Sequence, residues 1–122
     1  MKTLYINGLK ICPELLVFVT EQQRNIDNNA HLDRGGVRGW KKKTIHVGCF
    51  DLGEEYRDVV MTTDHLENPI GGDEANAPSM PTVLKECADV ANHSMHLADQ
   101  CGALGVDSDH FSIEIEVKEE SC

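Results

Sequence analysis

The longest regular pattern in the sequence is helical and runs from Pro81 to Cys101, where Gly102 and Gly105 supply the stop. At about 100° per residue, its apolar and small side chains gather on one broad face. These side chains are Val83, Leu84, Cys87, Ala88, Val90, Ala91, Met95, Leu97, Ala98 and Cys101. Such a face must be covered by other elements, and 122 residues suffice for one modest core but not for two domains. We therefore expect a single domain over residues 1–122.

A first helix is predicted near the N-terminus. Pro13 can open it, and its amphipathic pattern continues to Arg24. Residues 25–39 are polar and rich in glycine, which predicts a loop.

The segment between residues 45 and 62 is ambiguous by pattern alone. Gly48 and Gly53 disfavour a helix by about 1 kcal/mol each relative to alanine. Four apolar side chains nevertheless recur at helical spacing: Leu52, Tyr56, Val59 and Val60. We expect a helix from about Phe50, followed by a connecting loop over residues 64–80, which hold two prolines and two glycines.

Both ends of the chain predict strands. Residues 3–11 alternate around Asn7-Gly8, the preferred two-residue hairpin turn. Residues 111–118 alternate strictly, which predicts a half-buried strand whose obvious partner is the N-terminal hairpin. The predicted fold is therefore mainly α: an antiparallel helical bundle over residues 14–104, with a small antiparallel β-sheet formed by the N- and C-terminal segments.

The charge balance limits the partners. The chain has 21 acidic and 11 basic residues, a net charge of −10 and a pI near 4.9. This charge repels nucleic acid and anionic membrane, so neither is expected as a direct partner. It suits a cation site, or a surface that imitates a polyanion.

The cysteines and the N-terminal segment bear on location. Five cysteines, an odd number without a CxxC pair, argue against a zinc ribbon and predict reduced thiols in a cytosol. The N-terminal segment does not resemble a signal peptide, and no long apolar run is present. We therefore expect a cytoplasmic location.

Two acidic pairs carry the predicted chemistry. Glu86 and Asp89 are three residues apart and project to nearly the same side of the long helix. Glu55 and Asp58 have the same separation, so antiparallel packing of the two helices would bring four carboxylates to one seam. Clusters of oxygen ligands prefer Mg²⁺, with Mn²⁺ as a substitute, and Mg²⁺ binds polyphosphates and helps to generate an attacking hydroxide. The alternative is a pair of solvated acidic faces, because such pairs also arise by chance among 21 acids.

The segment that begins at Glu86 resembles a known family. It reads ECADVANHSMHLAD and is similar to the ExxD helix of the MazG-type all-α nucleoside triphosphate pyrophosphohydrolases, which in small phage and archaeal members reads approximately EAADVANFAMMIAD. Residues 18–31, with Gly39-Trp40 after them, resemble the first helix and following loop of those relatives. The family pattern is EExxE followed by ExxD. Glu54, Glu55 and Asp58 fit its first half, with aspartate in the last place and 27 residues before Glu86.

The resemblance implies hydrolysis of a nucleoside triphosphate to the monophosphate and pyrophosphate. It implies that the four carboxylates of the two pairs bind Mg²⁺ and that Glu54 supports a ligand or acts as a water-orienting base. Asn92 and His31 become candidate contacts to the nucleotide substrate. Asp58, Gly53, His93 and His96 depart from the family pattern, which leaves open a relative with another substrate or without catalysis.

Other residues have two interpretations each. Trp40 can stack on a base or be buried. Lys42, within the run Lys41–Lys43, can grip phosphates or belong to a solvated basic patch. His93 and His96 can join a mixed nitrogen and oxygen metal site, or pack as ordinary polar side chains.

Two expectations concern the whole protein. The relatives assemble as dimers or tetramers, and two motif helices bury little surface alone, so a homodimer or homotetramer is expected. The alternative to the enzyme is a non-catalytic acidic protein on the same scaffold, which sequesters a nucleotide or occupies a basic groove of a host enzyme.

Overall fold

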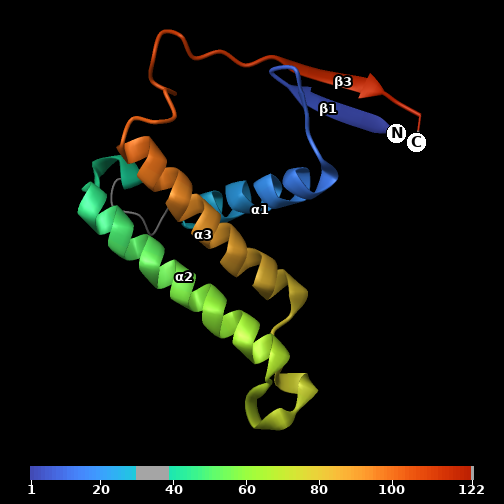
Figure 1. The fold of residues 1–122 in the computed structure, drawn as a ribbon, viewed down its shortest axis with the longest axis vertical. Coiled ribbons are helices and arrows are strands. Elements are labelled where there is room, and N and C mark those ends of the chain that lie inside the picture. Colours follow the sequence, from blue (N-terminus) through green and yellow to red (C-terminus); the bar gives the residue numbers. More distant parts are fainter. Residues whose placement is uncertain (30–38, 122) are drawn as a thin grey trace.

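The computed structural model describes residues 1–29 and 39–121, and its fold is mainly helical with a small antiparallel sheet, as predicted (Figure 1). The helices are α1 (Pro13–Asn29), α2 (Ile45–Glu67) and α3 (Met80–Gln100), and the strands are β1 (Lys2–Ile6), β2 (Leu9–Lys10) and β3 (Ile115–Glu119). In the described part of the chain, no helix has both the length and the apolar character required to cross a membrane. The candidate substrate contact His31 lies outside the described residues.

Helix α3 confirms the strongest prediction to within one residue at each end. Ser79 caps its N-terminus, where the Ser79 hydroxyl accepts a hydrogen bond from the Thr82 amide at 3.3 Å. After the C-cap residue Cys101, Gly102 adopts a φ of 78°, the left-handed conformation that ends many helices and that glycine adopts without strain.

Helix α2 begins earlier than predicted. Thr44 caps it by accepting a hydrogen bond from the Val47 amide at 3.3 Å, and both Gly48 and Gly53 lie inside the helix. The expected start at Phe50 was wrong because Gly48 serves the packing of α2 on α3. A Cβ atom at this position would clash with Oε1 of Gln100 on α3, so glycine leaves room for the Gln100 side chain, which offsets its poor helix propensity.

Two predicted loops are shorter than expected. Helix α1 continues to Asn29, so the predicted loop from residue 25 was wrong for its first five positions. The reason is tertiary: the side chain of Asn25 is buried against α3. Between α2 and α3 the chain forms two 3₁₀ turns, η2 (Ile70–Gly72) and η3 (Glu74–Asn76), after α2 has continued to Glu67.

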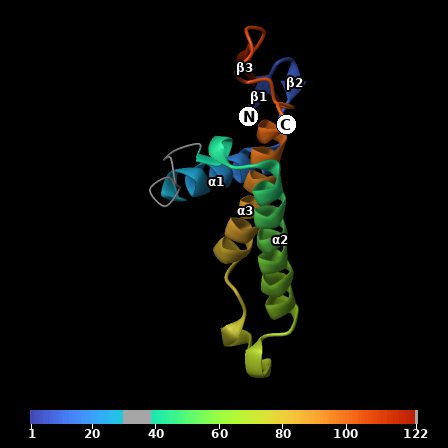
Figure 2. The same ribbon diagram turned by 90° about the vertical axis from the view of Figure 1, so that its left-hand side faces the viewer.

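Helix α3 lies between the other two helices. Helices α2 and α3 run side by side and antiparallel, while α1 crosses α3 on its other side (Figures 1 and 2). The 3₁₀ turn η1 (Gly39–Lys42) packs on α3 and precedes α2. Because α1 and α2 both pack on α3 rather than on each other, the three helices do not enclose a common core.

The terminal sheet joins the two ends of the chain in the order β2-β1-β3. Asn7 and Gly8 form the predicted turn, with φ values of 50° and 78°. Strand β3 pairs antiparallel with β1, as predicted, but begins at Ile115 rather than at residue 111. The expectation that it is half-buried was wrong, because every residue of β3 is exposed and no described helix packs broadly on the sheet.

Among the described residues, more polar than apolar side chains are buried. Trp40 and Ala88 are the buried hydrophobic side chains, whereas the buried polar ones are Thr3, Glu21, Asn25, Asp89 and Asn92. The accessible surface of the chain is 8797 Å², although a compact monomer of 13.5 kDa exposes about 6,500 Å². The contact between α1 and α3 is therefore largely polar. The chain also exposes roughly 2,300 Å² more surface than a compact monomer of its mass.

Candidate metal centre

Three carboxylates from two helices meet in the seam between α2 and α3. Glu55 of α2 and Glu86 and Asp89 of α3 each offer an oxygen, and these atoms all lie within 4.8 Å of one another. The antiparallel packing of the two helices brings them together: Gly48 lies beside Gln100, and the chain runs from there along α2 to Glu55 and back along α3 to Asp89 and Glu86. The structure thus assembles three of the four expected ligands.

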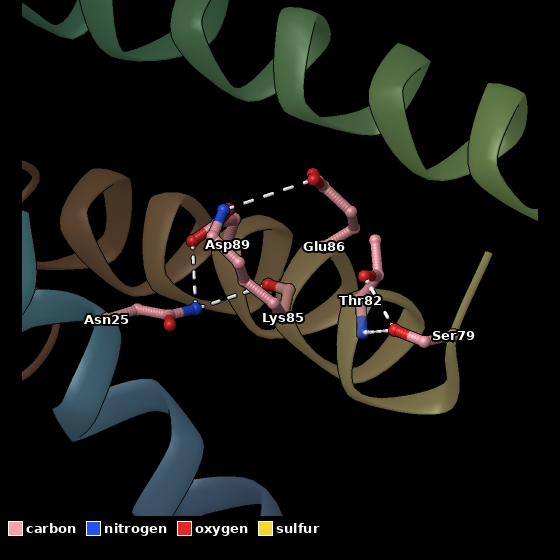
Figure 3. A network of polar contacts seen from close by, with 6 residues as sticks. All are labelled: Asn25, Ser79, Thr82, Lys85, Glu86 and Asp89. Carbon is pink, nitrogen blue, oxygen red and sulfur yellow. Dashed lines mark hydrogen bonds and ion pairs between the residues drawn. The ribbon is translucent and has the colours of Figure 1, made fainter.

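Asp89 is held from two sides. Its Oδ1 accepts a hydrogen bond from the Asn25 amide of α1 at 2.9 Å, and its Oδ2 lies 3.2 Å from Nζ of Lys85 (Figure 3). Asn25 also donates to the backbone carbonyl of Lys85 at 3.2 Å. Asp89 is only 8% exposed, so these contacts give a buried charge the partners that it requires.

The charges in the seam influence one another. Burial raises the pKa of Glu55, and the negative charges of Asp89, Asp58 and Glu86 raise it further, against the opposing effect of His93. Burial acts to lower the pKa of Lys85, but the hydrogen bond to Asp89 and the surrounding carboxylates raise it overall. The carboxylates therefore create a site that favours positive charge.

The donor set fits a hard divalent cation. All three side chains offer carboxylate oxygens, the ligands that Mg²⁺ and Mn²⁺ prefer. Lys85 supplies one positive charge, at 3.2 Å from Asp89 and 3.9 Å from Glu86. One lysine cannot neutralise three carboxylates, so the charge of the site leaves room for a cation.

Two predicted residues stand outside the carboxylate group. Asp58 is exposed and lies one turn beyond Glu55 on α2. Its charge helps to raise the pKa of Glu55, but its oxygens are not among those that lie within 4.8 Å of one another. Glu54 is exposed and lines a shallow hollow with Phe50, Gly53 and Arg57 among others. Successive helical residues differ by about 100° in direction, which places Glu54 on another flank of α2 from Glu55.

The predicted substrate contact Asn92 lies on α3 one turn beyond Asp89. Its Nδ2 donates to the backbone carbonyl of Gln22 on α1 at 3.0 Å, and Nε2 of Gln22 donates back to its Oδ1 at 3.3 Å. Next to it is a small cavity of about 50 Å³ that is lined mostly by residues with polar side chains. The walls are formed by Asn25, Ile26, Asn29, Trp40, Lys43, Asp89, Asn92, His93 and His96.

Trp40 is buried, the second of the two interpretations that the sequence left open. Its Nε1 donates to Asp99 at 2.9 Å, and its ring stacks on His96 with centroids 4.1 Å apart and planes within 8°. His93 tilts against His96 at 5.1 Å. Burial lowers the pKa of His96 to about 4, with His93 and Lys43 adding to the effect, so this ring is neutral at neutral pH. The histidines thus belong to a ring stack beside the carboxylates.

The basic run lies just before α2, with Lys41 and Lys42 in η1 and Lys43 after it. Lys42 is exposed in η1. Lys41 lies 3.0 Å from both Asp99 and Asp107, and Lys43 lies 3.3 Å from Asp51. The two flanking lysines are therefore paired within the chain.

Sequence reasoning missed two residues of the site. Lys85 is four residues before Asp89 and adjacent to Glu86, so the helical spacing of the sequence contains this ion pair. Asn25 was missed because nothing in the sequence indicates that α1 crosses α3 at this point.

No model of a known protein family, no curated protein and no solved structure matches this chain. The resemblance to the MazG-type enzymes consequently rests on the quoted residues.

Proposed function

We propose that the chain is a Mg²⁺-dependent nucleoside triphosphate pyrophosphohydrolase on a MazG-like scaffold. The observation that carries the proposal is the meeting of Glu55, Glu86 and Asp89 across two antiparallel helices, within 4.8 Å of one another. A polar cavity adjoins this group and shares Asp89 with it. A cation site beside hydrogen-bonding groups is the arrangement that a nucleotide polyphosphate requires.

Each residue of the site has a distinct role in the proposed reaction. Glu55, Glu86 and Asp89 would hold the ion, with Asp58 as a fourth ligand one turn from Glu55. When bound, Mg²⁺ supplies charge neutralisation for the phosphates and activation of water. Lys85 would then move from Asp89 to a phosphate oxygen. Glu54 lies on another flank of α2, where none of its contacts with described residues supports a role as base, so its assignment rests on the resemblance alone.

The substrate contacts follow from the polar cavity. At about 50 Å³ it is smaller than a nucleobase, so we propose that it receives a sugar hydroxyl or one edge of the base. Asn92 and Asn25 offer amide groups on its walls. Trp40 forms part of the wall, and its ring stacks on the His96 ring. A nucleobase could therefore stack on Trp40 only if the His96 ring moved aside. Lys42 is proposed as a phosphate contact from η1.

Pyrophosphate release tests the enzyme directly. Each common NTP and dNTP is incubated with the protein and Mg²⁺, and pyrophosphate is measured. The variant Glu86→Ala should lose activity by about 100-fold, because it removes a charge that holds the ion. Glu67→Ala, a matched change at the far end of α2, should keep it. Absence of pyrophosphate from every nucleotide would overturn the proposal.

A second candidate function is the non-catalytic acidic binding protein. It is favoured by the pairing of Lys85 with Asp89 and Glu86, which partly satisfies the carboxylates without a metal. Melting curves with and without Mg²⁺ or Mn²⁺ separate the two functions. Stabilisation that disappears in Glu86→Ala supports the enzyme, whereas curves unchanged by metal support the binding protein.

The proposal includes assembly into a homodimer or homotetramer in the cytoplasm. Apolar side chains on α2 stand in solvent, among them Phe50, which is 66% exposed. The surplus of roughly 2,300 Å² is comparable with what permanent interfaces bury. The described cysteines are unpaired, which agrees with a reducing compartment.

A further inference from the structure

The two faces of the terminal sheet differ sharply in character. In the observed register Leu4 stands opposite Val117, and Ile6 stands opposite both Leu9 and Ile115, so these five side chains share one face. Leu9 is 69% exposed, Ile115 63% and Val117 58%. We call this set the apolar sheet face.

On the opposite face, the polar side chains contact one another within the sheet and at its edge. The Tyr5 hydroxyl donates a hydrogen bond to Glu120, and Nζ of Lys118 lies 4.7 Å above the Tyr5 ring. Lys10 lies 3.3 Å from the same Glu120. This face is suited to water, so the apolar sheet face is the one that requires a cover.

The cover does not come from the described part of the same copy. A small sheet gains independent stability when its hydrophobic face packs on another element. Here α1, α2 and α3 pack among themselves, and the sheet extends away from them at the end of the molecule where both termini lie (Figures 1 and 2). The described helices of this copy therefore leave the apolar sheet face exposed.

We infer that the apolar sheet face packs against the same face of a second copy of this chain. The two sheets would form an aligned sandwich around a two-fold axis, in which each copy presents the same patch. The surplus of accessible surface shows that the chain has area to bury in such a contact. This inference is independent of whether the protein hydrolyses nucleotides.

Charge limits where two copies of this chain can meet, and the apolar sheet face is such a place. The chain has a net charge of −10, so two copies repel one another over most of their surfaces. On the apolar sheet face the charged strand residues are Lys2 and Glu119, which stand opposite each other with opposite signs. The face is thus neutral overall, and two such faces can meet without the repulsion that the rest of the chain creates.

A matched pair of substitutions tests the inference. Val117→Glu places a charge on the apolar sheet face, and Lys118→Gln changes the net charge equally on the opposite face. By light scattering after size exclusion, Val117→Glu should have half the mass of the wild-type assembly, and Lys118→Gln should keep the full mass. Circular dichroism confirms that both variants retain their helices. A wild-type monomer at about 100 μM, or an unchanged mass for Val117→Glu, would overturn the inference.

Cross-linking locates the contact without disrupting it. A photoreactive phenylalanine analogue is placed at Ile115, and copies labelled with ¹⁴N and ¹⁵N are mixed before irradiation. We expect cross-links between the two labels that reach residues 2–9 or 115–119, and none from the same probe at Glu116. Cross-links between copies that reach the helices instead, or cross-links confined to single copies, would contradict sheet-on-sheet packing.

Discussion

Among single residues, Asp89 has the most constrained surroundings. It is buried, accepts a hydrogen bond from Asn25 and pairs with Lys85, which is itself half exposed. A buried carboxylate is costly unless its oxygens are satisfied, and one of the two partners of Asp89 is a lysine side chain that reaches solvent. Lys85 can therefore leave Asp89 when another cation enters, whereas Asn25 holds the other oxygen in place.

Lys85→Met should reveal this competition. Without Lys85 the carboxylates repel each other unshielded, so the metal-free variant should melt at a lower temperature than the wild type. Because Mn²⁺ no longer has to displace a lysine, its Kd should fall about tenfold, which corresponds to about 1.4 kcal/mol of binding free energy. Titration calorimetry and melting curves measure both effects. Lys10→Met, far from the seam, is the control, and a weaker Mn²⁺ affinity in Lys85→Met would contradict competition.

Glu55 predicts a dependence of stability on pH. Burial and the neighbouring carboxylates raise its pKa above the unfolded value of about 4.3. The folded state therefore binds this proton more tightly, and its stability decreases as pH rises through the raised pKa. In EDTA near pH 7, Glu55→Gln should melt above the wild type, and the difference should vanish below about pH 4.

Two comparisons check the assignment to Glu55. Glu54→Gln removes a neighbouring carboxylate outside the group and should not reproduce the pH-dependent difference. Excess Mn²⁺ should stabilise the wild type more than Glu55→Gln, which has lost a charged ligand. A melting temperature of Glu55→Gln at or below that of the wild type in EDTA near pH 7 would contradict the raised pKa.

Among the elements, local patterns predicted α3 and the hairpin because their stabilising features lie within a few residues. Ser79 and Gly102 bound α3, and Asn7-Gly8 fixes the turn. The start of α2 could not be predicted, because the benefit of Gly48 comes from α3, distant in sequence.

The candidate site, too, was predictable only where local spacing determines it. The spacing of three residues indicated which acids share a side of each helix, and the antiparallel pair brought three of them together. The role of Asn25 depended on where α1 crosses α3, which no local pattern encodes.

The two glycines of α2 provide a matched test of helix packing. A Cβ at Gly53 would meet nothing within 4 Å, so Gly53→Ala should stabilise the protein by roughly 0.5–1 kcal/mol. At Gly48 a Cβ would displace Gln100, whose Nε2 donates to the Trp40 carbonyl at 2.8 Å. Gly48→Ala should therefore destabilise it by about 1 kcal/mol. Urea unfolding measures both, and equal stabilisation by the two would contradict the close approach.

For the whole molecule, the balance between exposed apolar surface and net charge determines whether copies associate in solution. The helices and the terminal sheet expose apolar side chains, and the buried polar residues between α1 and α3 contribute little hydrophobic stabilisation. Association would cover the exposed apolar surface, but each copy has a net charge of −10. Stability and assembly should thus be linked, and both should respond to salt.

Dilution and salt test this link together. If folding depends on association, the melting temperature should fall as the protein is diluted from about 100 μM to about 1 μM. Raising ionic strength from about 20 mM to about 200 mM shortens the screening length from roughly 20 Å to 7 Å, which weakens the repulsion between copies. The dissociation constant from analytical ultracentrifugation should then decrease severalfold. An increase with salt would mean that ion pairs hold the copies together, and a melting temperature independent of concentration would mean that one copy is stable despite its exposed apolar faces.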